Sequence, residues 1–89
     1  MDLRGRVALV TGAGRRVGRA LAVALGAEGM NVAVHYHASD AGARETARMI
    51  ERAGGKGWLV AADLTGDTAA GLIDDVVRQL GGLDVLVNS

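Results

Sequence analysis

Residues 7–20 read VALVTGAGRRVGRA, and this stretch decides how the rest of the chain is interpreted. A run of β-branched and aliphatic residues leads into a glycine-rich turn, and helix-periodic apolar residues follow at Val17, Leu21, Ala24 and Leu25. That order predicts a strand, a tight turn and a helix whose free N–H groups and dipole favour an anion such as a phosphate. Gly12 permits the turn, and Gly18 permits close packing of the helix on the sheet or of the backbone on a pyrophosphate. The alternative is a structural turn that needs glycines for its shape alone.

The composition predicts one small domain with an aliphatic core. The chain has 89 residues and zero net charge, and Tyr36 and Trp58 are its only aromatic residues. Val, Leu, Ile and Ala must therefore form the core, which suits a parallel sheet covered by helices on both faces. Zero net charge provides no basic face for nucleic acid. The chain has no cysteine, so a disulfide framework, a thiolate nucleophile and a cysteine metal site are excluded, and its two histidines predict no metal site.

Nothing in the sequence predicts a membrane segment. No apolar run reaches the length that spans a bilayer, and the charged start MDLRGR, residues 1–6, lacks the apolar centre of a signal peptide. We therefore expect a soluble, cytoplasmic protein with no membrane partner.

Apolar runs and helical patterns alternate along the whole chain. Strands are expected at residues 6–11, 31–36, 57–62 and 83–88, and helices at about 17–28, 40–53 and 67–80. Ser39 and Thr65 are candidate N-caps for the second and third helices, and the third helix would bury Leu72, Ile73, Val76, Val77 and Leu80. Strict βαβαβαβ alternation predicts an α/β fold, a parallel, right-handed, doubly wound sheet with strand order 3-2-1-4.

Three motifs occur in order, TGAGRRVG at residues 11–18, DL at 63–64 and LDVLVN at 83–88. Together they resemble the N-terminal part of a short-chain dehydrogenase/reductase, and the resemblance covers the whole chain. It is closest to pteridine-reductase-like members, which also carry Arg at the position of Arg16 and His-Tyr-His after the second strand, here residues 35–37. Ser89 departs from the family, which usually has a second Asn there. The resemblance implies the N-terminal half of a Rossmann-type fold, with residues 1–89 as a partial NADP(H)-binding domain.

The resemblance also implies an oxidoreductase parent. Such enzymes transfer a hydride between a nicotinamide cofactor and a small molecule, here a carbonyl or a pterin-like C=N. Family members are roughly two to three times longer and carry their catalytic Ser, Tyr and Lys in the later part. No catalytic residue is assigned here, because Tyr36 is the only tyrosine and no lysine lies four residues after it. We expect the chain alone to be inactive and the full-length protein to form a homo-oligomer.

The cofactor can be argued from charge. A dinucleotide fold that selects the unphosphorylated ribose usually places Asp or Glu at the end of its second strand. Here residues 34–39 read VHYHAS, and the first acid is Asp40. Arg15 in the glycine turn could instead face a 2′-phosphate in a charge-assisted pair, and the resemblance points the same way. Ser39 could donate its hydroxyl to that phosphate, and His37 could stack or hydrogen-bond nearby. The sequence thus predicts NADP(H), with NAD(H) as the alternative.

Further site residues are carried over from the resemblance. Asp63 would accept from the adenine amino group while Leu64 supplies a backbone contact, although Asp63 could also serve only in capping the third helix. Arg16 would reach the pyrophosphate or the acidic edge of a substrate pocket, unless both arginines are solvated turn residues. Asn88 would tie the fourth strand to its neighbour. The predicted cofactor-binding set is Gly12, Gly14, Arg15, Arg16, Val17, Gly18, His35, Tyr36, His37, Ser39, Asp63, Leu64 and Asn88.

Two other classes of function share parts of this pattern. A nucleotide-binding module without chemistry of its own would share the glycine turn and the fold. A methyltransferase also has a glycine turn after its first strand, but usually needs an acid at the end of the second strand to hold a ribose, and none stands there. The reductase portion is therefore the first hypothesis and the non-catalytic module the alternative.

Overall fold

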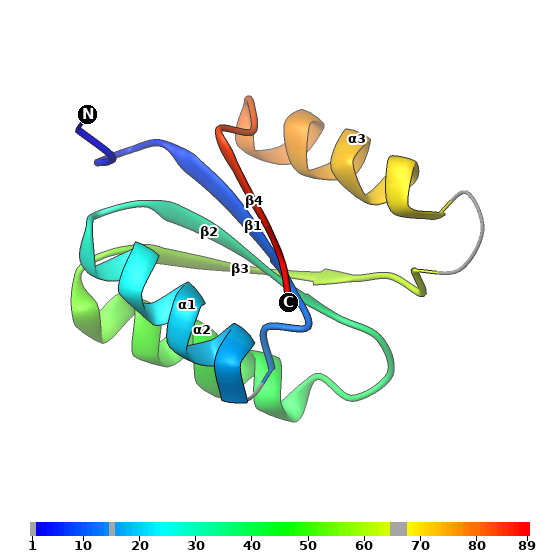
Figure 1. Ribbon diagram of the computed structural model, residues 1–89, viewed down its shortest axis with the longest axis horizontal. Helices are drawn as coiled ribbons and strands as arrows, with labels where there is room; N and C mark the ends of the chain where they lie inside the picture. The colour runs from blue at the N-terminus through cyan, green and yellow to red at the C-terminus, as the bar shows by residue number, and fades with distance from the viewer. Residues whose placement is uncertain (1, 15, 65–67) are drawn as a thin grey trace.

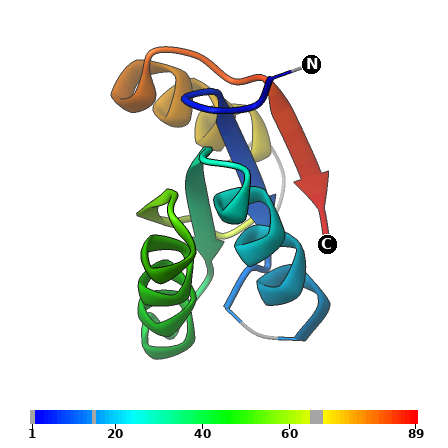
Figure 2. The ribbon, with the colours of Figure 1, turned by 90° about the vertical axis from the view of Figure 1, so that its left-hand side faces the viewer.

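The computed structural model describes residues 2–14, 16–64 and 68–89, in which four strands alternate with three helices. All strand pairs are parallel and the order is β3-β2-β1-β4, so the predicted doubly wound α/β sheet is confirmed. Helices α1 and α2 cover one face of the sheet and α3 covers the other (Figure 1), as the turned view also shows (Figure 2). The elements are β1 (Val7–Thr11), α1 (Arg16–Ala27), β2 (Asn31–Tyr36), α2 (Ala41–Ala53), β3 (Lys56–Ala61), α3 (Thr68–Leu80) and β4 (Val85–Asn88).

The central strand β1 separates two apolar cores. Alternate residues of β1 and β2 face α1 and α2, where Val10, Val34 and Ile50 are fully buried. The residues between them face α3, where Leu9 packs near Val76. Every residue of β1 is buried, which is the burial expected of a central parallel strand.

The fourth strand begins two residues later than predicted, and Asp84 is the reason. Its carboxylate oxygen Oδ2 accepts from the N–H of Val7 at 2.8 Å, and its own N–H donates to the Val7 carbonyl at 2.8 Å. A side chain thus substitutes for one ladder hydrogen bond, and the regular register starts at Ala8 opposite Val85. Arg6 lies 3.5 Å from the other carboxylate oxygen and neutralises this charge.

Two predictions about the helices are wrong. The N-cap of α2 is Asp40 rather than Ser39, and no side chain makes a capping hydrogen bond there. On α3, Leu72 and Val76 face the sheet and are buried, whereas Val77, expected in the same stripe, is 42% exposed because it lies at the margin of the contact. The cap predicted at Thr65 lies outside the described residues.

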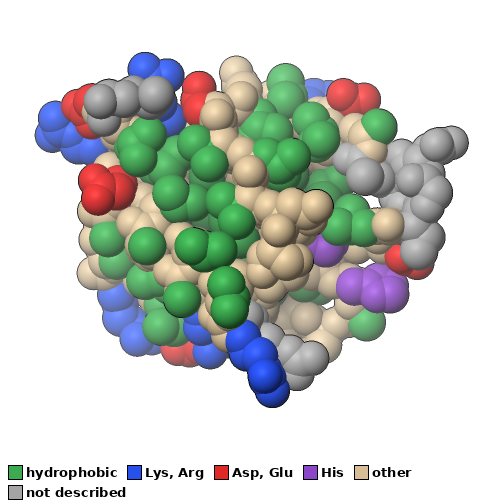
Figure 3. All heavy atoms as spheres, viewed as in Figure 1, with side chains coloured by type: hydrophobic (Ala, Val, Ile, Leu, Met, Phe, Trp, Pro, Cys, Tyr) green, Lys and Arg blue, Asp and Glu red, His purple; other side chains and the backbone are tan. Residues whose placement is uncertain are grey.

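One face of the molecule carries hydrophobic side chains, which gather over α1 and β4 (Figure 3). Val17 and Leu21 of α1 and Leu86 of β4 are the large apolar residues exposed on these two elements. Of the helices in the described part of the chain, none combines the length and the apolar character that crossing a membrane requires.

Candidate functional site

The glycine turn lies at the carboxyl end of β1 and leads into α1. Gly12 has a φ of 61°, a left-handed conformation that glycine adopts at little cost. A Cβ at Gly18 would lie 2.3 Å from the Gly12 carbonyl oxygen, so the close approach predicted at Gly18 is made to the turn itself. Arg16, the first residue of α1, is also left-handed, with a φ of 57°. Arg15 lies outside the described residues.

A buried histidine holds this turn in place. His35 of β2 is 5% exposed, and its Nδ1 accepts from the Gly12 N–H at 3.0 Å. Because Nδ1 is the acceptor, the proton of the neutral ring is on Nε2, which donates to the Ala62 carbonyl at 2.8 Å. The backbone carbonyl of His35 also accepts from Ala13 at 3.2 Å. His35 was predicted as a cofactor contact, but the protein itself takes up both of its ring nitrogens.

Thr11 joins the turn to the end of β4. Its hydroxyl donates to Oδ1 of Asn88 at 3.0 Å and accepts from the Ser89 N–H at 3.1 Å. The predicted tie between Asn88 and the neighbouring strand is therefore present. The partner, Thr11, was not predicted, although its place directly before the first glycine is visible in the sequence.

A cavity of about 500 Å³ opens between the glycine turn and the segment that joins β2 to α2. The structure brings several predicted residues together in its wall and adds two that the prediction missed, Arg19 and Gly42. The full lining is Gly12, Gly14, Arg19, His35, Tyr36, His37, Ser39 and Gly42.

The charges around this cavity are uneven. Arg19 contributes a guanidinium, and no carboxylate is among the described residues of the wall. The nearby acids are paired, since Asp40 binds Arg44 at 2.7 Å and Asp63 lies 3.5 Å from Nε2 of His37, whose ring lines the wall. The His37–Asp63 contact joins the ends of β2 and β3, and both side chains are largely exposed.

The remaining predicted residues are separated from this cavity. Leu64 and Asn88 line a smaller cavity of about 110 Å³ beneath α3, with Thr11 and apolar residues of β1, α3 and β4. Val17 is 67% exposed and, like Arg16, lines neither cavity. Gly18 and Asp63 line neither cavity as well, so the described residues of the predicted set divide between the larger cavity, the smaller cavity and positions outside both. Both cavities lie at the carboxyl edge of the sheet. That edge is where ligands bind in open α/β sheets.

The fold and the turn define a Rossmann-like α/β protein, and comparison with known proteins gives its family. The chain belongs to the short-chain dehydrogenase family, whose model matches residues 6–89. It is 43% identical over 89 residues to a 3beta-hydroxysteroid dehydrogenase of Eggerthella lenta, an alignment that covers 99% of this chain and 34% of that enzyme. The chain spans about a third of the length of this relative and of several other curated relatives.

Solved structures give the same result. A Burkholderia cenocepacia dehydrogenase with bound NADP aligns with a TM-score of 0.89 and 34% identity, covering 98% of this chain and 34% of that one. The NADH-dependent reductase A1-R′ complexed with NAD aligns with a TM-score of 0.89 and 32% identity, covering 98% and 36%. Both cofactors thus occur among proteins that share this fold.

Proposed function

We propose that this chain is the NADP(H)-binding N-terminal part of a short-chain oxidoreductase. One observation carries the proposal, the charge of the cavity beside the glycine turn. Its described wall holds the Arg19 guanidinium, the His37 ring and the Ser39 hydroxyl, and no carboxylate. A carboxylate at the end of β2 would accept from the 2′-hydroxyl of NAD(H) and repel a 2′-phosphate. The position where it would stand is held by Tyr36 and His37.

The roles of the other residues follow from family membership and from their positions. Arg15 would pair with the 2′-phosphate, and Ser39 would donate its hydroxyl to it. Asp63 and Leu64, at the end of β3, would contact the adenine. Arg16 and Val17, exposed at the start of α1, would contact the pyrophosphate at the helix N-terminus.

The whole protein would transfer a hydride between the nicotinamide and a small-molecule carbonyl or pterin-like C=N. The pterin-like substrate rests on Arg16 and on His-Tyr-His at residues 35–37, which resemble pteridine-reductase-like members. The catalytic Ser, Tyr and Lys and the surfaces of a homo-oligomer would lie in the remainder of such a protein. The 89 residues would then bind cofactor without turnover, which a non-catalytic nucleotide-binding module would do as well.

Backbone NMR of the isotope-labelled chain tests the binding proposal residue by residue. Titration with 2′,5′-ADP, which carries the phosphate that distinguishes NADP, should shift the amide signals of Gly14, Ser39 and Gly42. Titration with 5′-AMP, which lacks the 2′-phosphate, should shift Ser39 much less. Signal shifts confined to residues around the smaller cavity beneath α3, such as Leu86, would contradict the proposal. The absence of any saturable shift with either nucleotide would contradict it as well.

A turnover assay tests whether the 89 residues catalyse the reaction by themselves or only bind the cofactor. The purified chain should oxidise no NADPH above a buffer blank with pterins, quinones or ketoacyl thioesters. Turnover that persists in a Tyr36→Phe variant would place the chemistry elsewhere in these 89 residues and overturn the assignment of roles.

A further inference from the structure

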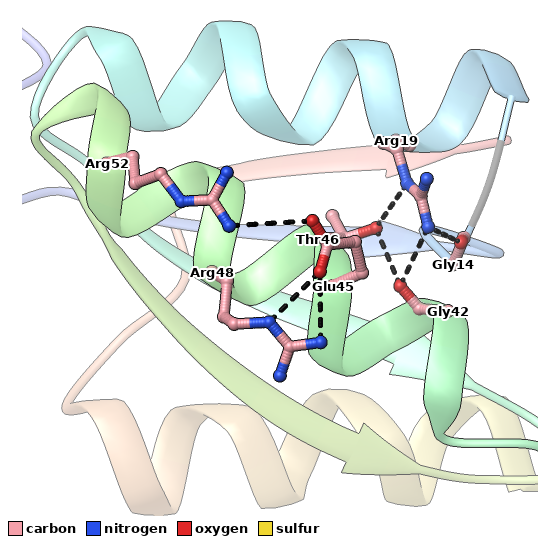
Figure 4. Close-up of polar contacts among 7 residues, drawn as sticks. All are labelled: Gly14, Arg19, Gly42, Glu45, Thr46, Arg48 and Arg52. Carbon is pink, nitrogen blue, oxygen red and sulfur yellow. Dashed lines mark hydrogen bonds and ion pairs between the residues drawn. The ribbon is translucent and has the colours of Figure 1, made fainter.

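A polar network joins the glycine turn to the start of α2. Arg19 reaches across from α1, and its Nη2 donates to the carbonyls of Gly14 at 2.7 Å and Gly42 at 3.1 Å (Figure 4). Its Nε donates to the hydroxyl of Thr46 at 3.0 Å. Thr46 is fully buried and its hydroxyl lies 2.8 Å from the Ala13 carbonyl and 3.0 Å from the Gly42 carbonyl. We call these two side chains and the carbonyls they bind the Arg19–Thr46 clasp.

We propose that Arg19, acting with Thr46, is a positioning residue that sets the shape of the cofactor cavity. The clasp holds the glycine turn and the first turn of α2 at the separation that the adenosine half of the cofactor requires. This inference rests on the proposed function and assigns to Arg19 a role that its position in the sequence does not reveal.

The clasp fixes the orientation of the turn. The carbonyls of Ala13 and Gly14 both point to groups of the clasp. In a planar trans peptide the N–H points opposite to the C=O, so holding the Ala13 carbonyl also sets the direction of the Gly14 N–H. A preorganised donor binds an anion more tightly than one that must first be oriented.

The clasp also sets a distance. A Cβ at Gly42 would lie 2.5 Å from the Gly14 carbonyl oxygen, so α2 and the turn are already in closest contact. Arg19 holds that contact by donating to the carbonyls of both glycines. Both carbonyl oxygens carry partial negative charge, and the guanidinium that donates to both offsets their repulsion.

A neighbouring pair of arginines has no such role and provides the control. Arg48 and Arg52 bind the carboxylate of Glu45 on the outer surface of α2 (Figure 4). The Arg48 hydrogen bond lowers the pKa of Glu45, and the charges of Arg48, Arg52 and Arg19 act in the same direction. Removing Arg48 deletes one guanidinium from α2 without touching the turn.

The test compares substitutions at these positions in the full 89-residue chain. Arg19→Met removes the clasp, Arg19→Lys keeps the charge without the fork of donors, and Arg48→Met is the matched control. Thr46→Val keeps the shape of the side chain and loses the hydroxyl, whereas Thr46→Ser keeps the hydroxyl. Affinities for 2′,5′-ADP and for nicotinamide mononucleotide are measured by NMR titration, and far-UV circular dichroism checks that each variant is folded.

For 2′,5′-ADP we expect losses of about tenfold or more in Arg19→Met, Arg19→Lys and Thr46→Val, the size of a hydrogen bond to a charged group. Arg48→Met should bind as the unchanged chain does, and Thr46→Ser should recover most of the affinity that Thr46→Val loses. The affinity for nicotinamide mononucleotide should be the same in all variants. A folded Arg19→Met chain with unchanged affinity overturns the inference. Full recovery in Arg19→Lys also overturns it, because charge alone would then be sufficient.

A second measurement needs no ligand and separates this inference from the proposed function. In the free chain, amide hydrogen exchange at Ala13, Gly14 and Gly18 should be faster in Arg19→Met than in Arg48→Met. If the unchanged chain binds no nucleotide, the proposed function fails, and the exchange rates still decide whether the clasp positions the turn. Equal rates in the two variants would overturn the clasp.

Discussion

His35 accepts a hydrogen bond from the backbone N–H of Gly12 across 3.0 Å and is almost completely buried. Through its other ring nitrogen it binds Ala62, the residue before Asp63. One imidazole therefore joins the glycine turn at the end of β1 to the end of β3, where the adenine contact is proposed. These two sides of the candidate site are held together by a side chain of the strand between them.

Replacing this ring by one without nitrogen should destabilise the chain. His35→Phe keeps an aromatic ring but leaves the Gly12 N–H and the Ala62 carbonyl without this partner. Each of these two part-buried hydrogen bonds contributes about 0.5–1.5 kcal/mol, so losing both should lower the free energy of unfolding by about 1–3 kcal/mol. Urea unfolding followed by circular dichroism measures this, and an unchanged midpoint would show that water replaces the ring without cost.

Gly18 should not tolerate a side chain. In Gly18→Ala the new Cβ would lie 2.3 Å from the Gly12 carbonyl oxygen, and since that atom is backbone, the turn must move. We expect lower stability and weaker nucleotide binding together. Gly71→Ala is the control, because a Cβ added there would meet nothing within 4 Å and Gly71 is exposed within α3. That variant should gain about 0.5–1 kcal/mol of stability, because alanine favours a helix. Thermal unfolding of both variants should show a lower melting temperature for Gly18→Ala and a higher one for Gly71→Ala. A change in the same direction in both variants would contradict this account.

Most of the fold could be predicted because it depends on local patterns. The apolar runs at residues 7–11 and 31–36 and the helical stripe with Leu72 and Val76 each determine their own element, and alternation along the chain determines the topology. Two of the incorrect details depend on a distant partner. Asp84 shortens β4 by binding Val7, and Val77 is exposed because of where α3 meets the sheet.

The site was predicted less completely than the fold, and for the same reason. The glycines and the end of β2 have a sequence signature, so the wall of the larger cavity was largely expected. Arg19, Thr46 and the ring contacts of His35 have none, because each acts on residues 23 to 33 positions away. Such contacts exist only once the helices are packed.

Arg16 should be replaceable by glycine with a gain in stability. Its φ of 57° is left-handed, which costs a residue with a Cβ roughly 1–2 kcal/mol relative to the right-handed conformation. Arg16→Gly removes that cost from the folded state. Glycine also makes the unfolded chain more flexible, which offsets part of the gain, so the free energy of unfolding should rise by about 1 kcal/mol. Arg16→Ala keeps the Cβ and should gain nothing. Denaturant unfolding of the two variants should therefore give different midpoints, and identical ones would argue against the left-handed conformation.

The edge of β4 should cause the 89-residue chain to associate. Within the described residues β4 pairs only with β1, and Leu86 is half exposed beside the open edge. An open apolar edge pairs readily with another chain, and a lysine on such a strand prevents this. Leu86→Lys should lower the apparent mass in light scattering at high concentration, whereas Val77→Lys, which adds a lysine at an exposed apolar position of α3, should not. A monomeric unchanged chain at every concentration would contradict this account.

The preference for NADP(H) is the central claim, and Arg15 tests it most directly. Titration by nicotinamide fluorescence compares NADPH and NADH on the unchanged chain, on Arg15→Glu and on Arg16→Glu. The unchanged chain should bind NADPH more tightly. Arg15→Glu should lower the affinity for NADPH by a factor of about ten to a hundred and fifty, because a charge-assisted hydrogen bond contributes roughly 1.5–3 kcal/mol. The affinity for NADH should change little. If Arg16 faces the pyrophosphate that both cofactors share, as proposed, Arg16→Glu should lower the affinity for both alike. If Arg15→Glu changes the affinities for NADPH and NADH by the same factor, the preference for NADP(H) is contradicted.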